Sequence, residues 1–207
     1  MKLLRPAIML TVFFVVGFGL LFPALIYGIA QTIFPHQANG SLIKDAQGQI
    51  IGSELLGQNF AAAKYFHPRP SAAGSGYDAA NSGGTNLGPN SDKLINGVPD
   101  DPKTKDVDES YAGVKQLAEA YRKENNLSAD AVLPTDAVTR SASGLDPDIS
   151  PENARLQAQR VATARGMTAD QIEQLVSQHT HGRWLGIYGE ARVNVLEINL
   201  ALDKAKS

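Results

Sequence analysis

The sequence predicts an α+β protein, with a single N-terminal transmembrane helix followed by one exported domain that has a small sheet and about three helices. Three observations predict this class. Residues 6–35 contain no charged side chain, the segments 40–52 and 192–202 have strand-like patterns, and three segments between them have helical spacing or helix caps. We therefore expect a cytoplasmic N-terminus (1–5), a transmembrane helix (6–35) and an extracytoplasmic domain (36–207).

Residues 6–35 are apolar on every side, which is typical of a helix surrounded by lipid. A bilayer core of about 30 Å needs roughly 20 helical residues, and a helix satisfies its own backbone hydrogen bonds in lipid. The alternative is a cleaved signal peptide, because Gly28-Ile29-Ala30 has small residues spaced like a cleavage site. The apolar core of a secretory signal is usually about 7–15 residues long. Ala7 to Tyr27 is longer than that, so we favour a permanent membrane helix.

Positive charge indicates the orientation of this helix. Lys2 and Arg5 precede the apolar segment, whereas on its other side the positive charge of Lys44 is cancelled by the negative charge of Asp45. Positively charged flanks stay in the cytoplasm. The prediction is a single-pass protein with its N-terminus in the cytoplasm and its C-terminal domain outside.

The composition of the remaining 172 residues excludes several functions. They hold 17 basic and 21 acidic residues, and this negative balance argues against nucleic acid or an anionic lipid surface as the main partner. The chain has no cysteine, so it has no disulfide, no thiolate chemistry and no cysteine-type zinc site.

Small residues in the apolar segment indicate a contact with other membrane helices. Ala24 and Gly28 are four residues apart and would allow a second helix to approach closely. Gly17 is a further small residue at which a second helix could approach. Pro23 has no backbone N–H to donate, which predicts a local irregularity in the helix. We predict a membrane-helix interface at Gly17, Pro23, Ala24 and Gly28. The alternative is that glycine and proline are simply common in membrane helices.

Two outer parts of the domain have strand patterns, and one inner part has neither strand nor helix signals. Residues 40–52 read as a short hairpin, and 192–202 as a strand with a bulge at Val195-Leu196, so a small sheet would contain 42–51 and 193–202. Residues 68–104 are rich in glycine, proline and serine, which predicts an irregular loop that touches a partner.

Three helices are predicted in the domain. One begins at Asp106, with acids in its first turn and an apolar stripe that starts at Val114. The second has Ser150 as its N-cap and ends at Gly166, with a narrow stripe formed by Ala154, Ala158, Val161 and Ala162. The third starts at Thr168 with a capping box to Gln171.

No constellation of residues predicts an active site. His179 and His181 could bind a metal only with a third ligand, which the sequence does not suggest. Ser141 and Ser143 with Asp146 lack the nucleophile elbow of a hydrolase, and the glycine-rich segment 83–88 lacks the lysine of a P-loop. We expect no catalytic residue, no metal and no directly bound cofactor.

The ordered motifs of the chain identify a family. They occur in order at residues 4–7, 37–43, 51–60, 65–66 with 69–72, 82–87, 138–146, 160–165 and 193–203. In these motifs, which cover nearly the whole sequence, the chain resembles the C subunits of the Kdp-type potassium-transporting P-type ATPases.

This resemblance implies a subunit that is not itself an enzyme. It implies a bacterial inner (plasma) membrane location and three partners, namely a channel-like potassium-binding subunit, an ATP-hydrolysing subunit and a small membrane peptide. It also implies that the chain raises the ATP affinity of the hydrolysing subunit. A glutamine after the Ser/Thr-Pro of the second helix has been assigned nucleotide contact in this family, but here Glu152 follows Pro151. The alternative function is a membrane-tethered hydrolase or binding protein that acts alone.

Overall fold

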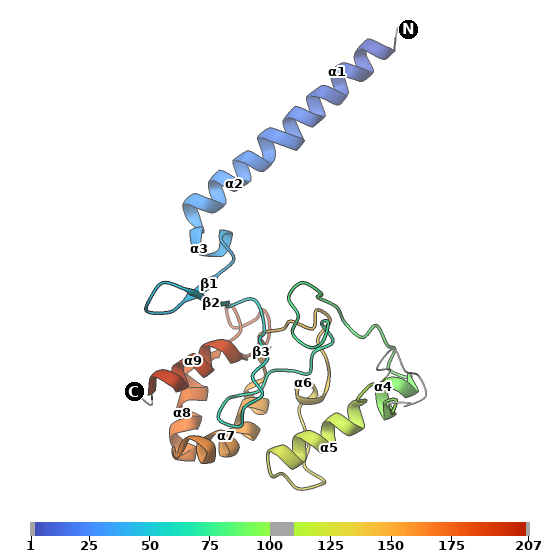
Figure 1. The fold of residues 1–207 in the computed structure, drawn as a ribbon. Helices are drawn as coiled ribbons and strands as arrows, with labels where there is room; N and C mark the ends of the chain where they lie inside the picture. The colour runs from blue at the N-terminus through green and yellow to red at the C-terminus, as the bar shows by residue number, and fades with distance from the viewer. Residues whose placement is uncertain (1–2, 100–109, 206–207) are drawn as a thin grey trace. The chain divides into compact units, whose positions relative to one another are not determined.

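A computed structural model describes residues 3–99 and 110–205, and the chain divides into two compact units, Met1–Ser53 and Glu54–Ser207. The first unit contains a continuous helix, Leu4–Ile33, which is 30 residues long and apolar enough to cross a membrane (Figure 1). It consists of α1 (Leu4–Phe14), a π-helical stretch η1 (Val15–Leu21) and α2 (Phe22–Ile33).

The short helix α3 (Pro35–Ala38) leads into the predicted hairpin, which is formed by β1 (Leu42–Lys44) and β2 (Ile50–Ser53). The two strands are antiparallel, with Ile43 opposite Gly52 and a bulge after Ile43. The Asp45 carboxylate closes the turn, since its Oδ1 accepts hydrogen bonds from the backbone N–H groups of Gln47 and Gln49 at 2.9 and 2.8 Å.

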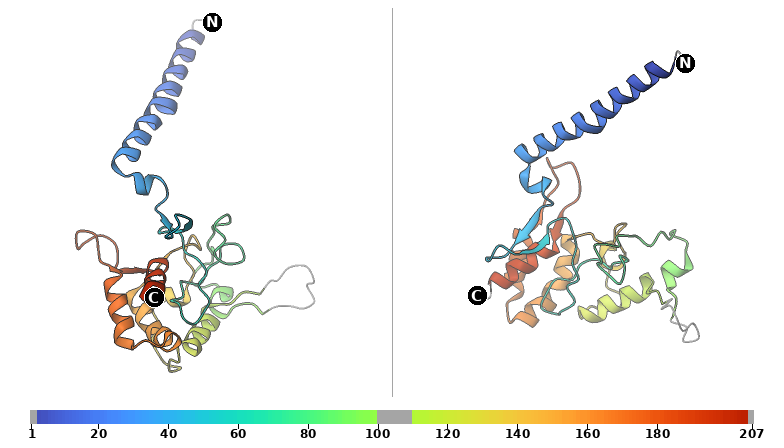
Figure 2. Two further views of the ribbon diagram at one scale, coloured as in Figure 1. Left: turned by 60° about the vertical axis from the view of Figure 1, so that its left-hand side comes forward. Right: turned by 45° about the horizontal axis from the view of Figure 1, so that its top comes forward.

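The second unit combines a small antiparallel sheet with helices, so the predicted α+β class is confirmed. Within the described residues the strands of this unit are β3 (Asp148–Ile149), β4 (Thr180–His181) and β5 (Arg192–Asn194). Its helices are, within the same residues, α4 (Asp92–Asn96), α5 (Val114–Glu124), α6 (Thr135–Val138), α7 (Pro151–Arg165), α8 (Ala169–Gln178) and α9 (Val195–Ala205). The strand order is β3-β5-β4, and α8 lies beside α7 and α9 (Figure 2).

The core of this unit lies between α7, α8, α9 and the sheet. The small residues of the predicted α7 stripe are all buried, and they let the other elements pack closely on that helix. The core residues are Phe66, Ile149, Ala154, Ala158, Val161, Ala162, Ile172, Val176, Val193, Val195, Ile198 and Leu202.

The helices α7 and α8 begin where the sequence predicts. The Ser150 hydroxyl accepts a hydrogen bond from the Asn153 N–H at 3.1 Å, and Gly166 ends α7 in a left-handed conformation with φ 65°. Thr168 and Gln171 form the predicted capping box of α8. The predicted helix at Asp106 fits less well, because α5 begins at Val114 and the predicted first turn lies outside the described residues.

The prediction of a strand over 192–202 is wrong beyond Asn194. The chain leaves the sheet there and enters α9, whose buried positions 195, 198, 199 and 202 follow helical spacing. The Asn194 side chain caps this helix by accepting a hydrogen bond from the Glu197 N–H at 3.1 Å. The phase change at Val195-Leu196 marks this boundary and not a bulge. The single predicted sheet is therefore wrong as well, because 42–51 and 193–194 belong to two separate sheets.

Residues 68–99 are irregular apart from α4, as predicted for 68–104, and residues 100–104 of that prediction lie outside the described residues. Side-chain and backbone hydrogen bonds hold this segment against the rest of the second unit. The Ser71 hydroxyl donates to the Gly144 carbonyl at 2.6 Å, and the Gly83 N–H donates to the Ser143 carbonyl at 2.8 Å. Gly144 has φ 68°, and a Cβ there would lie only 2.7 Å from the Ala73 nitrogen. This part of the chain is therefore packed in place and not a free linker.

Candidate functional site

Two parts of the molecule could carry its function: the face of the apolar helix Leu4–Ile33 and the polar surface of the second unit. On the apolar helix, Ala24 and Gly28 line one shallow groove together with Leu25 and Ile29. A Cβ at Gly28 would meet nothing within 4 Å, so the groove is open to a neighbouring helix.

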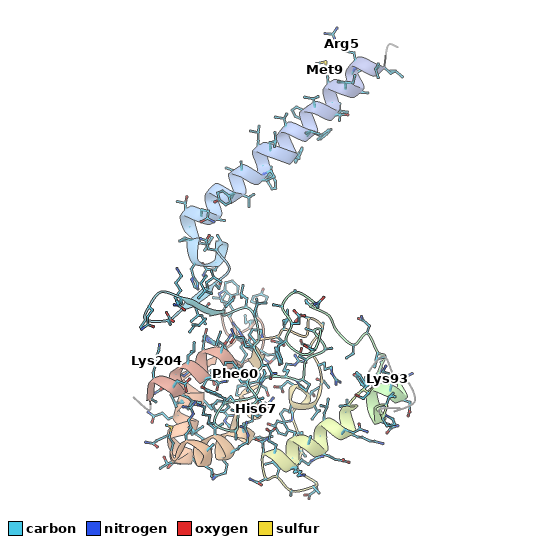
Figure 3. The ribbon with its side chains drawn as sticks, viewed as in Figure 1. Arg5, Met9, Phe60, His67, Lys93 and Lys204 are labelled. Carbon is cyan, nitrogen blue, oxygen red and sulfur yellow. The ribbon has the colours of Figure 1, made fainter. Side chains whose placement is uncertain are left out.

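The other two predicted interface residues lie apart from this groove. Gly17 lines a separate groove with Met9, Val12 and Phe13, and Pro23 lines neither of the two. Met9 is labelled on this helix in Figure 3. Ala24 and Gly28 therefore form the closely paired part of the predicted interface.

The π-helical stretch explains this separation. In a regular α-helix Gly17 would lie within about 20° of Ala24 and Gly28, since 3.6 residues complete a turn. In η1 the Phe22 N–H instead donates to the Gly17 carbonyl, five residues back. The extra residue in the turn rotates the preceding helix by roughly 100°. This irregularity directly precedes Pro23, which has no N–H to donate.

In the second unit, two side-chain amides hold one extended backbone segment. Asn199 of α9 accepts from the Phe66 N–H at 2.8 Å and donates to the Phe66 carbonyl at 2.9 Å. Gln157 of α7 does the same to the next residue, accepting from the His67 N–H at 2.7 Å and donating to its carbonyl at 3.0 Å. Each amide therefore replaces a neighbouring strand for one residue.

Two arginines of α7 satisfy the carbonyls that precede this segment. Arg160 donates to the Ala63 and Tyr65 carbonyls at 2.7 and 2.9 Å. Arg165 donates to the Lys64 carbonyl at 2.7 Å and forms an ion pair with Asp203 at 2.8 Å. Both side chains are buried, and burial lowers the pKa of the Arg160 guanidinium from its ordinary value.

A hollow opens beside this network, and it is lined by His67, Arg69, Tyr77, Phe60 and Glu124, among others; Figure 3 labels Phe60 and His67. His67 Nδ1 lies 3.1 Å from a Glu124 carboxylate oxygen, and this hydrogen bond holds the pKa of the Glu124 carboxyl below its usual range. Burial raises the pKa of the Tyr77 hydroxyl above its ordinary value, so Tyr77 keeps its proton and donates to the Arg69 carbonyl.

A second hollow has an excess of carboxylates. Arg69 bridges the two hollows, because its guanidinium pairs with Asp146 at 2.7 Å. Asp148 pairs with Arg192 at 2.9 Å, and burial raises the pKa of the Asp148 carboxyl although Arg192 opposes the rise. The hollow also contains Asp136, Glu152 and Glu190. Such a surface repels anions and favours a basic partner surface.

The side chains that the sequence analysis weighed for chemistry are engaged in local contacts. His181 Nε2 lies 3.1 Å from a Glu197 carboxylate oxygen, and His179 Nδ1 lies 3.0 Å from the Leu175 carbonyl. Ser141 and Ser143 face each other at 3.4 Å, while Asp146 pairs with Arg69. Among residues 3–99 and 110–205, no group of three His, Cys, Asp or Glu side chains is arranged to hold a metal ion.

Sequence reasoning missed the polar network, although α7 carried a signal for it. Asn153, Gln157 and Arg160 recur at spacings of four and three on a helix that also carries the buried alanine stripe, and all three are buried. Polar residues on the buried face of a helix need partners within the fold. The pattern indicates a network but cannot name Phe66 or His67 as its partners.

The chain matches the KdpC family, described as "K+-transporting ATPase, c chain", over residues 4–204. It is 51% identical over 201 residues to the "Potassium-transporting ATPase KdpC subunit" of Mycobacterium tuberculosis (strain ATCC 25618 / H37Rv), which covers 97% of both chains. Proteins of the same name from Caulobacter sp. (strain K31) and Koribacter versatilis (strain Ellin345) are 49% and 48% identical. These two matches cover 97% and 98% of this chain, and 92% and 94% of the relatives.

Replacing Glu124 by glutamine removes the charge that faces His67 and should lower the free energy of unfolding at pH 7. The loss should be only about 1 kcal/mol, because the carboxylate is partly exposed and glutamine still accepts a hydrogen bond. The folded-state pKa is depressed, so the contribution of the charge is present above the unfolded pKa and is lost as the pH falls through the folded pKa. Urea unfolding of the natural chain and the variant in detergent measures the difference in the free energy of unfolding at pH 7 and at about pH 3.

Glu119→Gln is the matched control, because Glu119 is exposed on the same helix. It should change the free energy of unfolding by less than about 0.5 kcal/mol at either pH. A loss at Glu124 that stays the same at low pH would show that the carboxylate charge is not what His67 stabilises.

Proposed function

The chain belongs to the KdpC family, the c chains of K+-transporting ATPases, and from this membership we propose that it is a non-catalytic accessory subunit. As a family member it is a component of a potassium-transporting ATPase complex. In our proposal it stabilises the assembled complex and raises the ATP affinity of the ATP-hydrolysing subunit. The observation that carries the proposal is the similarity over residues 4–204, which includes both the apolar helix and the domain.

The proposed setting is a bacterial inner membrane. The helix Leu4–Ile33 crosses it once, with the N-terminus in the cytoplasm and the second unit outside. The proposed partners are a channel-like potassium-binding subunit, the ATP-hydrolysing subunit and a small membrane peptide. The groove at Ala24 and Gly28 is the surface that packs against a helix of one of these partners.

The organisation of the second unit supports a binding role over a catalytic one. Its buried polar side chains are used to fix irregular backbone, as Gln157 and Asn199 fix Phe66 and His67. A surface built on such a network is pre-organised, and a pre-organised surface loses less conformational entropy when it binds.

An external domain can change ATP affinity without touching ATP. If it binds one conformation of the transporter more tightly than another, it favours that conformation, and the nucleotide site responds through a coupling free energy. We therefore propose no nucleotide site on this chain. Glu152, at the position where nucleotide contact has been assigned in the family, is exposed at the start of α7, and its nearest ion-pair partner is Arg155 at 4.0 Å.

The helix face can be tested by adding bulk. Gly28→Leu or Ala24→Leu should reduce co-purification of the chain with the other subunits on the order of tenfold, because leucine keeps a second helix from approaching. Gly19→Leu is the matched control, since Gly19 is equally open and lines neither groove. If the Gly28→Leu chain co-purifies with the other subunits as well as the Gly19→Leu chain does, this face is not an interface.

The coupling can be tested by its reciprocity. The complex that contains the chain should bind a fluorescent, non-hydrolysable ATP analogue about 5 to 150 times more tightly than the complex without it. A saturating analogue should then tighten the binding of the chain to the remaining subunits by the same factor. Equal ATP affinity with and without the chain would refute the accessory role.

The orientation can be tested with single cysteines, because the natural chain has none. Ser177→Cys places a thiol on an exposed position of α8, and a membrane-impermeant maleimide should label it on intact cells. Lys2→Cys should be labelled only after the cells are permeabilised. The opposite labelling pattern would place the domain in the cytoplasm.

A further inference from the structure

The segment between β4 and β5 exposes four large apolar side chains together. We call residues 183–190 the tip hairpin; Figure 2 shows this part of the chain as a loop that extends beyond the helices of its unit. Trp184, Leu185, Ile187 and Tyr188 are 69%, 71%, 73% and 62% exposed. Exposed apolar residues are common singly, but a cluster of four marks an interaction site.

The tip hairpin is an ordered element. The Trp184 N–H donates to the Tyr188 carbonyl at 2.8 Å, and the Tyr188 N–H donates back at 3.0 Å. The ring centroids of Trp184 and Tyr188 lie 5.7 Å apart. At the base of the hairpin, Arg183 and Glu190 form an ion pair with an N–O distance of 2.6 Å. The apolar side chains are therefore presented by a defined backbone.

The turn of the hairpin contains a residue that its backbone does not favour. Leu185 and Gly186 both have positive φ, 52° and 74°, and the Ile187 N–H donates to the Trp184 carbonyl at 3.1 Å. This is the pattern of a type I′ turn, in which asparagine or aspartate followed by glycine is preferred. A leucine at the first position is strained, and it is not buried within the chain.

The apolar tip is explained if another surface covers it. A bilayer would accept the same side chains without a fixed backbone, whereas a strained and hydrogen-bonded turn places them in one arrangement that suits a shaped recess. Tryptophan and tyrosine are also the side chains that most often dominate protein–protein binding energy. No charge lies between Arg183 and Glu190, so the part that would be desolvated is neutral.

We propose that the tip hairpin docks through Trp184, Leu185, Ile187 and Tyr188 into an apolar recess on another subunit of the potassium-transporting complex. This inference rests on the proposed function in taking that complex as the partner. It adds the element of the chain that makes the contact and the chemistry of the surface that receives it.

The decisive variant is Leu185→Asn. Asparagine is favoured at this turn position, so the hairpin should keep its fold while losing the apolar contact. The full chain is co-expressed with the other subunits and the complex is captured in mild detergent by a tag on the ATP-hydrolysing subunit. We expect the variant chain to dissociate about ten times faster than the natural chain, and Trp184→Ser at least as fast.

Val132→Ser is the matched control, because Val132 is 90% exposed but lies outside the hairpin. It should dissociate at the natural rate. If Leu185→Asn and Trp184→Ser also dissociate at the natural rate, the docking proposal is wrong. The proposed function then still stands as long as the chain raises ATP affinity; conversely, hairpin-dependent binding with no effect on ATP affinity would refute the proposed function alone.

The bilayer is tested separately. Trp184 is the sole tryptophan of the chain, so its fluorescence reports on the hairpin directly. The chain alone is placed in vesicles of phosphatidylethanolamine and phosphatidylglycerol with brominated acyl chains. Unquenched fluorescence agrees with a protein recess, and strong quenching would overturn the proposal in favour of lipid.

Discussion

The second unit depends on the way in which Asn199 and Gln157 bind the backbone of Phe66 and His67. Phe66 is fully buried, so its N–H and carbonyl need partners inside the protein, yet none of the described strands pairs with this segment. The two amides supply four hydrogen bonds between 2.7 and 3.0 Å. Leaving one such group unpaired costs about 1–3 kcal/mol, so these side chains bring α7, α9 and the irregular segment together as one structure.

This constraint gives the irregular part of the chain a fixed surface. Residues 60–88 have no helix or strand of their own, and their position comes from α7, α9 and the segment around Gly144. A domain built in this way can act on a larger assembly as a rigid body. Rigid contact is what a subunit needs if its binding energy is to distinguish two conformations of its partners.

Local signals made parts of this fold predictable. Apolar composition predicted the long N-terminal helix, and caps predicted α7 and α8, because the capping interactions lie within four residues. The end of the chain was harder, since Val193 and Val195 alternate like a strand while Ile198 and Leu202 have helical spacing. The partners of the polar side chains on α7 and α9 could not be predicted, because they lie 90 to 133 residues away in the sequence. The π-helical stretch was predicted only as an irregularity at Pro23.

The length of the apolar helix has a consequence of its own. Thirty residues at about 1.5 Å per residue give roughly 45 Å, which matches a whole bilayer with its headgroup layers and not only the core of about 30 Å. Burying all of it in the core would need a tilt of roughly 48°, beyond the usual range of membrane helices. A helix of this length that crosses a bilayer therefore ends in the headgroup layers on both sides. In the proposed membrane setting, the residues that follow Ile33 begin at the edge of those layers, where water is already present.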